Sequence, residues 1–213
     1  MNGRISGLYA ITPDLADTQR LIQQVRLALE GGTRCVQYRN KILDRSIRLQ
    51  QAAALLRLCR EFNVPLIIND SLDMTLEVEA DGVHLGVQDC RVSHAKNKLG
   101  ADKIIGASCY DNLQRATNAE AEGADYVAFG SFFASAVKPF AVQAPLKLLH
   151  EAKARLSVPV VAVGGIDLQN ASMVIGAGAD AVAVISALFN AQDIRETAKE
   201  FTALFARYHH GVA

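Results

Sequence analysis

A short pattern recurs four times along the chain, and it restricts the fold more than any other feature of the sequence. Each copy has a Gly or another small residue where a helix should end, usually an Asp, and then a short Val-rich run. The copies are EGGTRCVQYR (30–39), EADGVHLG (79–86), EGADYVAFG (122–130) and GAGADAVAVIS (176–186). Glycine after the last helical turn is a common stop signal, and Val-rich runs with little alternation are typical of strands buried on both faces. The repeat therefore predicts helices that alternate with buried strands.

Eight candidate strands follow when the chain is read outward from these copies. They start near Gly7, Thr33, Pro65, Gly82, Lys103, Tyr126, Pro159 and Ala181. Amphipathic segments such as 17–30 and 44–62 fill the intervals with apolar residues at helical spacing, although 71–79 is short for a crossover helix. Strands alternating with helices over 1–213 predict one α/β domain, a (β/α)8 TIM barrel. A doubly wound open sheet is the alternative that this alternation leaves open.

The charge balance and the cysteines narrow the classes of partner. Lys and Arg together number 22, as do Asp and Glu, so the chain has no overall field to attract a nucleic acid or an anionic membrane. Its apolar runs are shorter than the roughly 20 residues that cross a bilayer, and its start lacks the apolar core of a signal peptide. The four cysteines lie far apart, and three sit among apolar residues, as expected in a reducing compartment. We expect a cytoplasmic protein that binds small molecules, and we allow for a homodimer.

Polar residues gather where the expected strands end, which is where barrel enzymes place their active sites. The second strand continues into VQYRNK, in which Gln37, Arg39 and Lys41 are spaced by two and should share one face. The alternative is that Arg39 and Lys41 lie beyond the strand, in water or paired with carboxylates of the barrel. The other strand ends, with the loop after the sixth strand, contribute Asn69, Asp70, His84, Asp89, Ser108, Lys138, Gly164, Gly165, Ile185 and Ser186.

The chemistry of these residues indicates two anionic subsites in one mouth. The set forms neither a Ser-His-acid triad nor a ligand-spaced zinc cluster, and the adjacent His209 and His210 fit a solvated tail. Asp70 and Asp89, from neighbouring loops, are a typical protein share for Mg²⁺ beside substrate phosphate oxygens. Nearby cations would neutralise a diphosphate, and the Gly-Gly turn would bind a second phosphate through backbone N–H groups. Such a pair of ligands predicts transfer of a group from the first to the second.

The ordered motifs resemble those of the thiamine-phosphate synthase family. The resemblance covers nearly the whole chain, from LYAIT (8–12) through VQYRNK, IIND, DGVHLGVQD, IGASC, ADYVAFGSFF and the lysine of VKP to PVVAVGGI and ADAVAVISAL. It implies a (β/α)8 barrel that joins 4-amino-2-methyl-5-(diphosphooxymethyl)pyrimidine to hydroxyethylthiazole phosphate and releases diphosphate. The implied reaction is a dissociative substitution in which the thiazole nitrogen captures a methylene cation, so no protein nucleophile is needed.

The resemblance also assigns residues position by position. It implies that one Mg²⁺ ion is held by Asp70 and Asp89, and that Arg39, Lys41 and Lys138 stabilise the charge on the departing diphosphate. The pyrimidine diphosphate would be held by Gln37, Tyr38, Arg39, Asn40, Lys41, Asn69, Ser108 and Lys138. The thiazole phosphate would meet Ser135, Ala136, Val137, Gly165, Ile185 and Ser186.

One loop departs from the pattern of this family. Family members usually read close to P-T/S-x-T-K before the lysine, whereas this chain has ASAVK (134–138). Val137 thus replaces a threonine hydroxyl that would bind phosphate, and Ala134 replaces a proline that stiffens the loop. Loss of one hydrogen bond to a charged group is worth about 1.5–3 kcal/mol, which predicts weaker substrate binding. Two other functions stay open: a thiazole tautomerase-like isomerase on the same barrel, and a non-catalytic protein that binds a phosphate ligand.

Overall fold

The Val-rich runs form the strands of a closed parallel barrel, which the computed structural model shows for residues 5–134 and 143–210. In these residues the strands are β1 (Gly7–Ile11), β2 (Cys35–Tyr38), β3 (Leu66–Asn69), β4 (Gly82–Leu85), β5 (Ile104–Tyr110), β6 (Tyr126–Phe129), β7 (Val160–Val163) and β8 (Ala181–Val184). Each strand pairs with its neighbours in chain order, and β1 closes the circle against β8 in the register Leu8 to Val182. The predicted (β/α)8 barrel is confirmed, and the open-sheet alternative is wrong.

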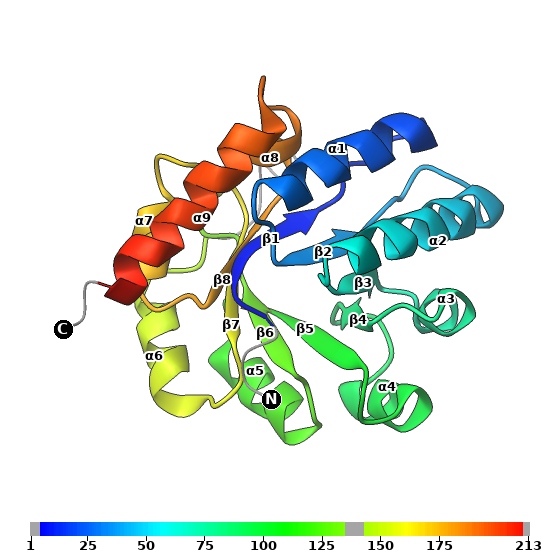
Figure 1. Ribbon diagram of the computed structural model, residues 1–213. Helices are drawn as coiled ribbons and strands as arrows, with labels where there is room; N and C mark the ends of the chain where they lie inside the picture. The colour runs from blue at the N-terminus through cyan, green and yellow to red at the C-terminus, as the bar shows by residue number, and fades with distance from the viewer. Residues whose placement is uncertain (1–4, 135–142, 211–213) are drawn as a thin grey trace.

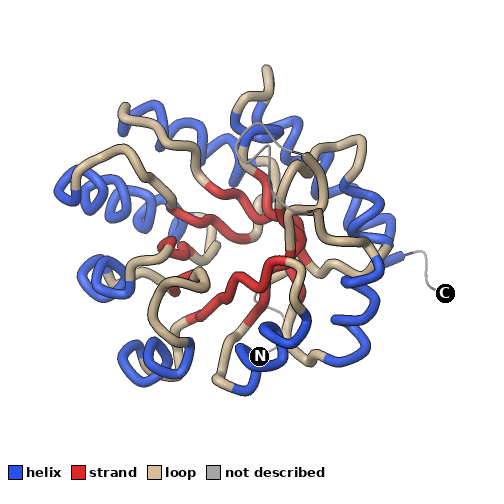
Figure 2. The backbone as a smooth tube through the Cα atoms, turned by 180° about the vertical axis from the view of Figure 1, so that it is seen from behind, coloured by secondary structure: helices blue, strands red, loops and turns tan. Residues whose placement is uncertain are grey.

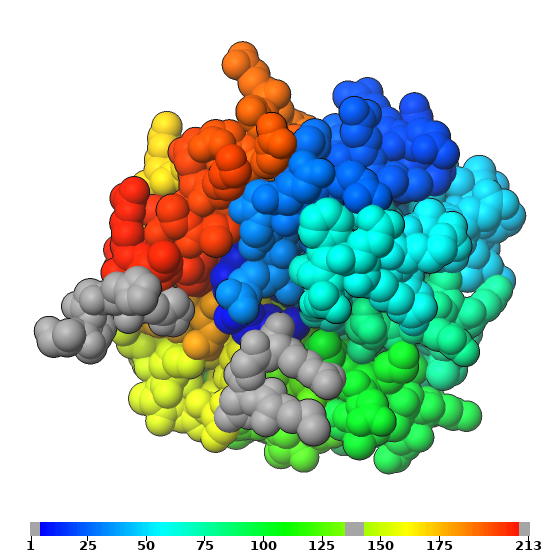
Figure 3. Space-filling view, in the orientation of Figure 1, coloured from blue at the N-terminus to red at the C-terminus, as the bar shows by residue number. Residues whose placement is uncertain are grey.

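Helices surround the barrel and follow one another in chain order (Figures 1 and 2). They are α1 (Thr18–Glu30), α2 (Arg45–Glu61), α3 (Leu72–Val78), α4 (Val92–Leu99), α5 (Leu113–Ala121), α6 (Lys147–Arg155), α7 (Ala171–Gly176), α8 (Ser186–Phe189) and α9 (Ile194–His210). The short segment 71–79 does contain a helix, α3. In the space-filling view the colours likewise run around the molecule from blue to red (Figure 3). Among the described residues, no helix has the length and apolar character needed to cross a bilayer.

Side chains at several helix starts explain where these helices begin. Asp17 accepts a hydrogen bond from the backbone N–H of Arg20 at 3.0 Å, and Asp44 accepts one from Ile47 at the same distance. Such N-caps satisfy donors that have no partner within the helix. Ser71 caps α3 in the same way. A cap of this kind helps even a helix of seven residues to start at a defined position.

The Asp of the repeated pattern ties neighbouring strands together at the amino end of the barrel. Asp81, Asp125 and Asp180 each precede an even-numbered strand. Their carboxylates accept from the backbone N–H groups of Leu66, Ile105 and Val160 at 2.7–2.9 Å. Because each bond runs to the preceding odd-numbered strand, the repeat fixes adjacent strands in pairs. The recurring Asp is therefore structural, and it lies at the end of the barrel away from the strand ends considered next.

Two apolar layers hold the barrel. The outer layer lies between strands and helices and includes Leu21, Leu55 and Phe201, all fully buried. The inner layer fills the barrel and includes Ile67, Val161 and Ala181. Cys35, Cys59 and Cys109 are buried and free, which confirms that three of the four cysteines are small core side chains. The inner layer also contains Tyr9 and Tyr126, which lie at the base of the functional site.

Candidate active site

A cavity of about 830 Å³ opens at the carboxyl ends of the strands. Residues from every strand or strand end around the barrel line it, so it is the mouth of the barrel. Seven residues predicted to bind substrate are in its lining, namely Gln37, Arg39, Asn69, Ser108, Gly165, Ile185 and Ser186. The predicted residues Ser135, Ala136, Val137 and Lys138 lie outside the described part of the chain, as do the side chains of His209 and His210.

The floor of the mouth is a continuous line of hydrogen bonds across the barrel interior. Gln37 Nε2 donates to the Tyr9 hydroxyl at 2.8 Å, and the Tyr9 and Tyr126 hydroxyl oxygens are 2.7 Å apart. Tyr126 bonds His84 Nδ1 at 2.9 Å, and His84 Nε2 bonds Ser108 Oγ at 2.8 Å. We call these five residues the relay. Tyr126 lies across β5, and Gly106 is required there because a Cβ would stand 2.0 Å from the tyrosine Cζ.

Burial keeps the interior members of the relay uncharged. It raises the pKa of the Tyr9 and Tyr126 hydroxyls well above their usual 10. Burial also lowers the pKa of His84 to about 4, while the charge of Asp89 acts in the opposite direction. His84 is therefore a neutral imidazole at pH 7.

The sequence analysis named His84 without giving it a role, and it missed both tyrosines. Their hydroxyl groups at inward-facing strand positions were a signal that could have identified them.

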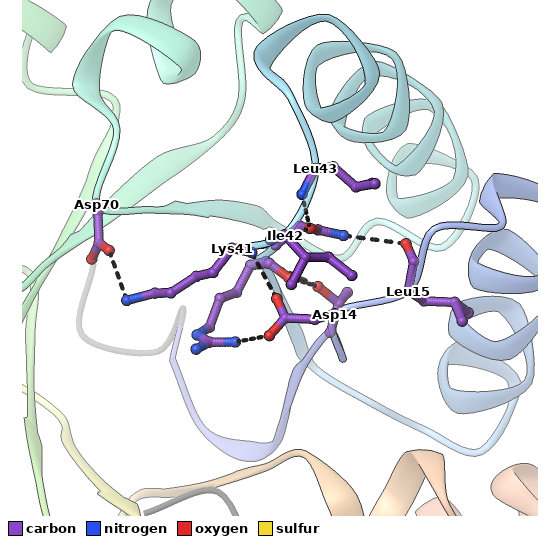
Figure 4. Close-up of polar contacts among 9 residues, drawn as sticks. Asp14, Leu15, Lys41, Ile42, Leu43 and Asp70 are labelled. Atoms are coloured by element: carbon purple, nitrogen blue, oxygen red, sulfur yellow. Dashed lines mark hydrogen bonds and ion pairs between the residues drawn. The ribbon is translucent and has the colours of Figure 1, made fainter.

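The two cations after β2 are held by carboxylates. Strand β2 ends at Tyr38, so Arg39 and Lys41 lie on the following loop, and the expectation that a strand pleat aligns them is wrong. Arg39 Nη1 pairs with Asp14 Oδ2 at 3.0 Å, and Asp14 Oδ1 accepts from the Lys41 backbone N–H at 2.7 Å (Figure 4). Lys41 Nζ reaches Asp70 Oδ2 at 3.7 Å. The alternative prediction, pairing with barrel carboxylates, describes these contacts. Asp14 was missed, although it lies three residues after Ile11, where the first strand ends.

Asp70 and Asp89 converge beside the mouth, after β3 and β4, and neither is among the residues that line the larger cavity. A Cβ placed on Gly86 would stand 3.0 Å from Asp89 Oδ2 and 3.9 Å from Asp70 Oδ1, so both carboxylates lie over that glycine. Partial burial, and then the charge of Asp89, raise the pKa of the Asp70 carboxyl, while Lys41 opposes the shift. In the described ranges, no group of three or more His, Cys, Asp or Glu residues could hold a metal. Mg²⁺ in proteins is often bound by one or two carboxylates, with substrate phosphate oxygens and water as the other ligands. Two carboxylates that repel each other fit that arrangement.

Tyr38 and Asn40 do not extend their side chains into this cavity. The Tyr38 hydroxyl donates to Gln51 Oε1 at 2.9 Å, in the layer between barrel and helices. Asn40 Nδ2 donates to the Leu15 carbonyl oxygen, and its Oδ1 accepts from the N–H groups of residues 42 and 43. Asn40 thus shapes the loop that carries the cations, whereas Tyr38 ties the end of β2 to α2. They also line a smaller neighbouring cavity of about 340 Å³ together with Lys41 and Asp70.

Across the barrel from the two carboxylates, the mouth is lined by a turn whose backbone N–H groups have no partner among the described residues. Gly164 and Gly165 have φ of +99° and +65°, which favour glycine. A Cβ on Gly165 would lie 2.4 Å from the Ala134 carbonyl oxygen and 2.6 Å from that of Phe133, so this turn packs closely against residues 133 and 134. In the part of the chain described, the N–H groups of Gly164 and Gly165 donate to no other residue. Ile185 and Ser186 line the mouth beside them, so a phosphate could be bound here by backbone donors.

Comparisons with known proteins agree with this architecture. The family model described as thiamine monophosphate synthase matches residues 8–188. A thiamine-phosphate synthase from Nitrosospira multiformis is 54% identical over 203 residues, covering 95% of this chain and 87% of that protein. One from Nitrosomonas eutropha is 50% identical and covers 95% of each chain.

Solved structures give the same result. A thiamine phosphate pyrophosphorylase from Pyrococcus furiosus superposes with a TM-score of 0.84 at 35% identity, covering 94% of this chain and 96% of that one. A 3-hexulose-6-phosphate synthase, at 18% identity and a TM-score of 0.71, shares the fold alone. The resemblance seen in the sequence motifs is thus confirmed along the length of the barrel, and the chain belongs to the thiamine monophosphate synthase family.

Proposed function

We propose that this chain transfers the pyrimidinylmethyl group from the aminopyrimidine diphosphate to hydroxyethylthiazole phosphate, giving thiamine phosphate and diphosphate. Family membership supports this reaction. The observation that carries the proposal within the structure is that two unlike sides face each other at the carboxyl end of the barrel. Asp70, Asp89 and Lys41 gather after β2, β3 and β4, whereas the Gly164–Gly165 turn follows β7 across the closed barrel. The first side suits a metal-bound diphosphate, and the second suits a phosphate bound without metal.

The residues act mainly through charge and position. In the proposed step the bond between the methylene carbon and the diphosphate oxygen breaks, and diphosphate leaves with the electron pair. The thiazole nitrogen then forms a bond to that carbon. Arg39, Lys41 and Lys138 stabilise the negative charge that grows on the leaving group, an electrostatic term that is usually large. Asp14 holds the Arg39 guanidinium in place before substrate arrives, and binding both substrates in one cavity contributes by proximity.

One Mg²⁺ ion fits the acidic side of this end of the barrel. Asp70 and Asp89 would hold it, because each would otherwise leave a carboxylate facing the other over Gly86. When bound, the ion would offset charge on the diphosphate oxygens. The metal site and the roles of individual residues are inferences from this donor set and from the family resemblance.

The test is product formation from the two substrates, measured with and without Mg²⁺. We expect thiamine phosphate to form only with the metal, and Asp70→Asn to require far more Mg²⁺ for half-maximal rate. Asp73→Asn is the matched control, because Asp73 is an exposed acid on α3 three residues away, and its Mg²⁺ requirement should match the wild type. A rate that ignores chelation would remove the metal from the proposal. If no product forms at any substrate concentration, the result favours a non-catalytic protein that binds a phosphate ligand. The predicted homodimer remains a prediction, which sedimentation at several concentrations would test.

A further inference from the structure

We infer that the relay couples two substrate contacts at opposite ends of the cavity floor: the one at Gln37 and the one at Ser108. This inference rests on the proposed function, because it assigns those two ends to the pyrimidine ring and to the diphosphate. Tyr9, Tyr126 and His84 are then positioning residues. Their task is to set whether the Gln37 amide offers an oxygen or an N–H group, and whether the Ser108 hydroxyl donates or accepts.

The geometry requires the hydrogen bonds of the relay to share one direction. Four contacts of 2.7–2.9 Å join the five side chains without a gap. Tyr9 and Tyr126 are 1% and 0% exposed, and His84 is 8% exposed, so water cannot readily replace a missing partner. Each tyrosine has one proton to give, and a neutral imidazole has one N–H. Reversing the Tyr9–Tyr126 or Tyr126–His84 link leaves a hydroxyl that accepts from both neighbours, and burial makes that arrangement costly. Reversing the link at Gln37 would require two protons on Tyr9, and reversing the link at Ser108 would leave the imidazole accepting at both nitrogens.

Two directions remain. In the first, the Gln37 N–H donates to Tyr9, Tyr9 to Tyr126 and Tyr126 to His84 Nδ1, while His84 Nε2–H donates to Ser108 Oγ. Gln37 Oε1 then faces the cavity as an acceptor, and the Ser108 proton is free to donate. In the second, Ser108 donates to His84 Nε2 and every bond reverses, so the Gln37 amide presents N–H groups and Ser108 presents lone pairs. The amide orientation in the structure is that of the first direction.

The first direction matches both ends of the proposed substrate. The amino group of the pyrimidine is a donor and needs the Gln37 oxygen, and the diphosphate is an acceptor and needs the Ser108 proton. Among the described residues, no hydrogen bond to Gln37 Oε1 is found, and both end residues line the cavity. An anion at Ser108 should therefore favour an amino group at Gln37 and disfavour a carbonyl group there. Such a coupling is reciprocal, and coupling of this kind typically changes affinities by about 5- to 150-fold.

The first test is the tautomer of His84, read from the ring nitrogens by ¹⁵N NMR of histidine-labelled protein. The His84 signals are identified by their loss in His84→Gln. With inorganic diphosphate and Mg²⁺ bound, the inference expects a protonated Nε2 and an unprotonated Nδ1. Tyr126→Phe should shift the ring toward a mixture of tautomers, because Nδ1 loses its donor. Tyr38→Phe is the matched control, since it removes a buried tyrosine hydroxyl outside the relay and should leave the His84 signals unchanged. A protonated Nδ1 in the diphosphate complex would overturn the inference.

The second test measures the coupling itself by calorimetry. The probes are 4-amino-5-hydroxymethyl-2-methylpyrimidine and its 4-oxo analogue, titrated with and without saturating inorganic diphosphate and Mg²⁺. In wild-type protein, diphosphate should raise the preference for the amino probe over the oxo probe by about fivefold or more. In Tyr126→Phe that rise should disappear, although both probes still bind. Tyr9→Phe interrupts the relay at another residue and should also abolish the rise in preference. This second variant keeps the test valid if Tyr126→Phe folds poorly.

The outcomes separate this inference from the proposed function. If the amino probe and diphosphate both bind but the preference does not respond to diphosphate, or responds equally in Tyr126→Phe, the relay does not couple the two ends. If neither the amino probe nor diphosphate binds to wild-type protein, the proposed function is wrong and the inference falls with it.

Discussion

His84 should make the folded protein less stable as the pH falls from neutral toward 4. Burial lowers its pKa in the folded state to about 4, against about 6.5 in an unfolded chain. Between these two values the unfolded chain binds a proton that the folded chain does not, so the free energy of unfolding falls as the pH falls. At 1.36 kcal/mol per unit of pKa difference, the loss between pH 7 and pH 5 is about 2 kcal/mol.

Urea denaturation of wild-type protein and of His84→Gln at pH 7 and pH 5 would measure this loss. The variant lacks the titrating ring, so its change in unfolding free energy between the two pH values should be smaller by about 2 kcal/mol. Asp70 contributes in the opposite direction because its folded pKa is raised, and this contribution cancels in the comparison. His94→Gln, which alters an exposed histidine on α4, should behave as the wild type does. An equal pH dependence in wild-type protein and His84→Gln would refute the reasoning.

Three further substitutions separate function from stability. Asp70→Ala should lower turnover by about 10²-fold or more, the scale for a lost transition-state stabiliser. Its unfolding free energy should change little, because the strain of Ala at a φ of +63° opposes the removal of repulsion from Asp89; steady-state rates and urea titrations check both, and a near-normal rate would contradict the assignment. Asp125→Ala should lower the stability and leave the turnover unchanged. It loses the 2.9 Å bond to the Ile105 N–H, so it should cost about 1–2 kcal/mol of stability with turnover per folded molecule retained, and an unchanged urea midpoint would count against the structural role of the repeat. Val137→Thr should lower the KM for thiazole phosphate if a hydroxyl belongs at that position, and an unchanged KM would argue against it.

The sequence predicted only part of the site. Asp70 and Asp89 could be paired from their strand-end positions, because parallel strands end at the same edge of a barrel. The relay could not be found in this way. Tyr9 and Tyr126 are separated by 117 positions, and only the closure of the barrel brings their hydroxyls within 2.7 Å of each other. The two cations after β2 were identified, but the carboxylates that hold them follow β1 and β3.

The sequence by itself determined the alternation of strands and helices. The observed strands begin within two residues of the expected positions, because helix stops and buried Val-rich runs are local signals that each segment carries alone. Closure of the sheet was decided only in three dimensions, since it depends on β1 pairing with β8 across almost the whole chain. The line of hydrogen bonds inside the barrel was decided there too. Each polar side chain in that interior must satisfy neighbours supplied by other strands, and no single segment specifies them.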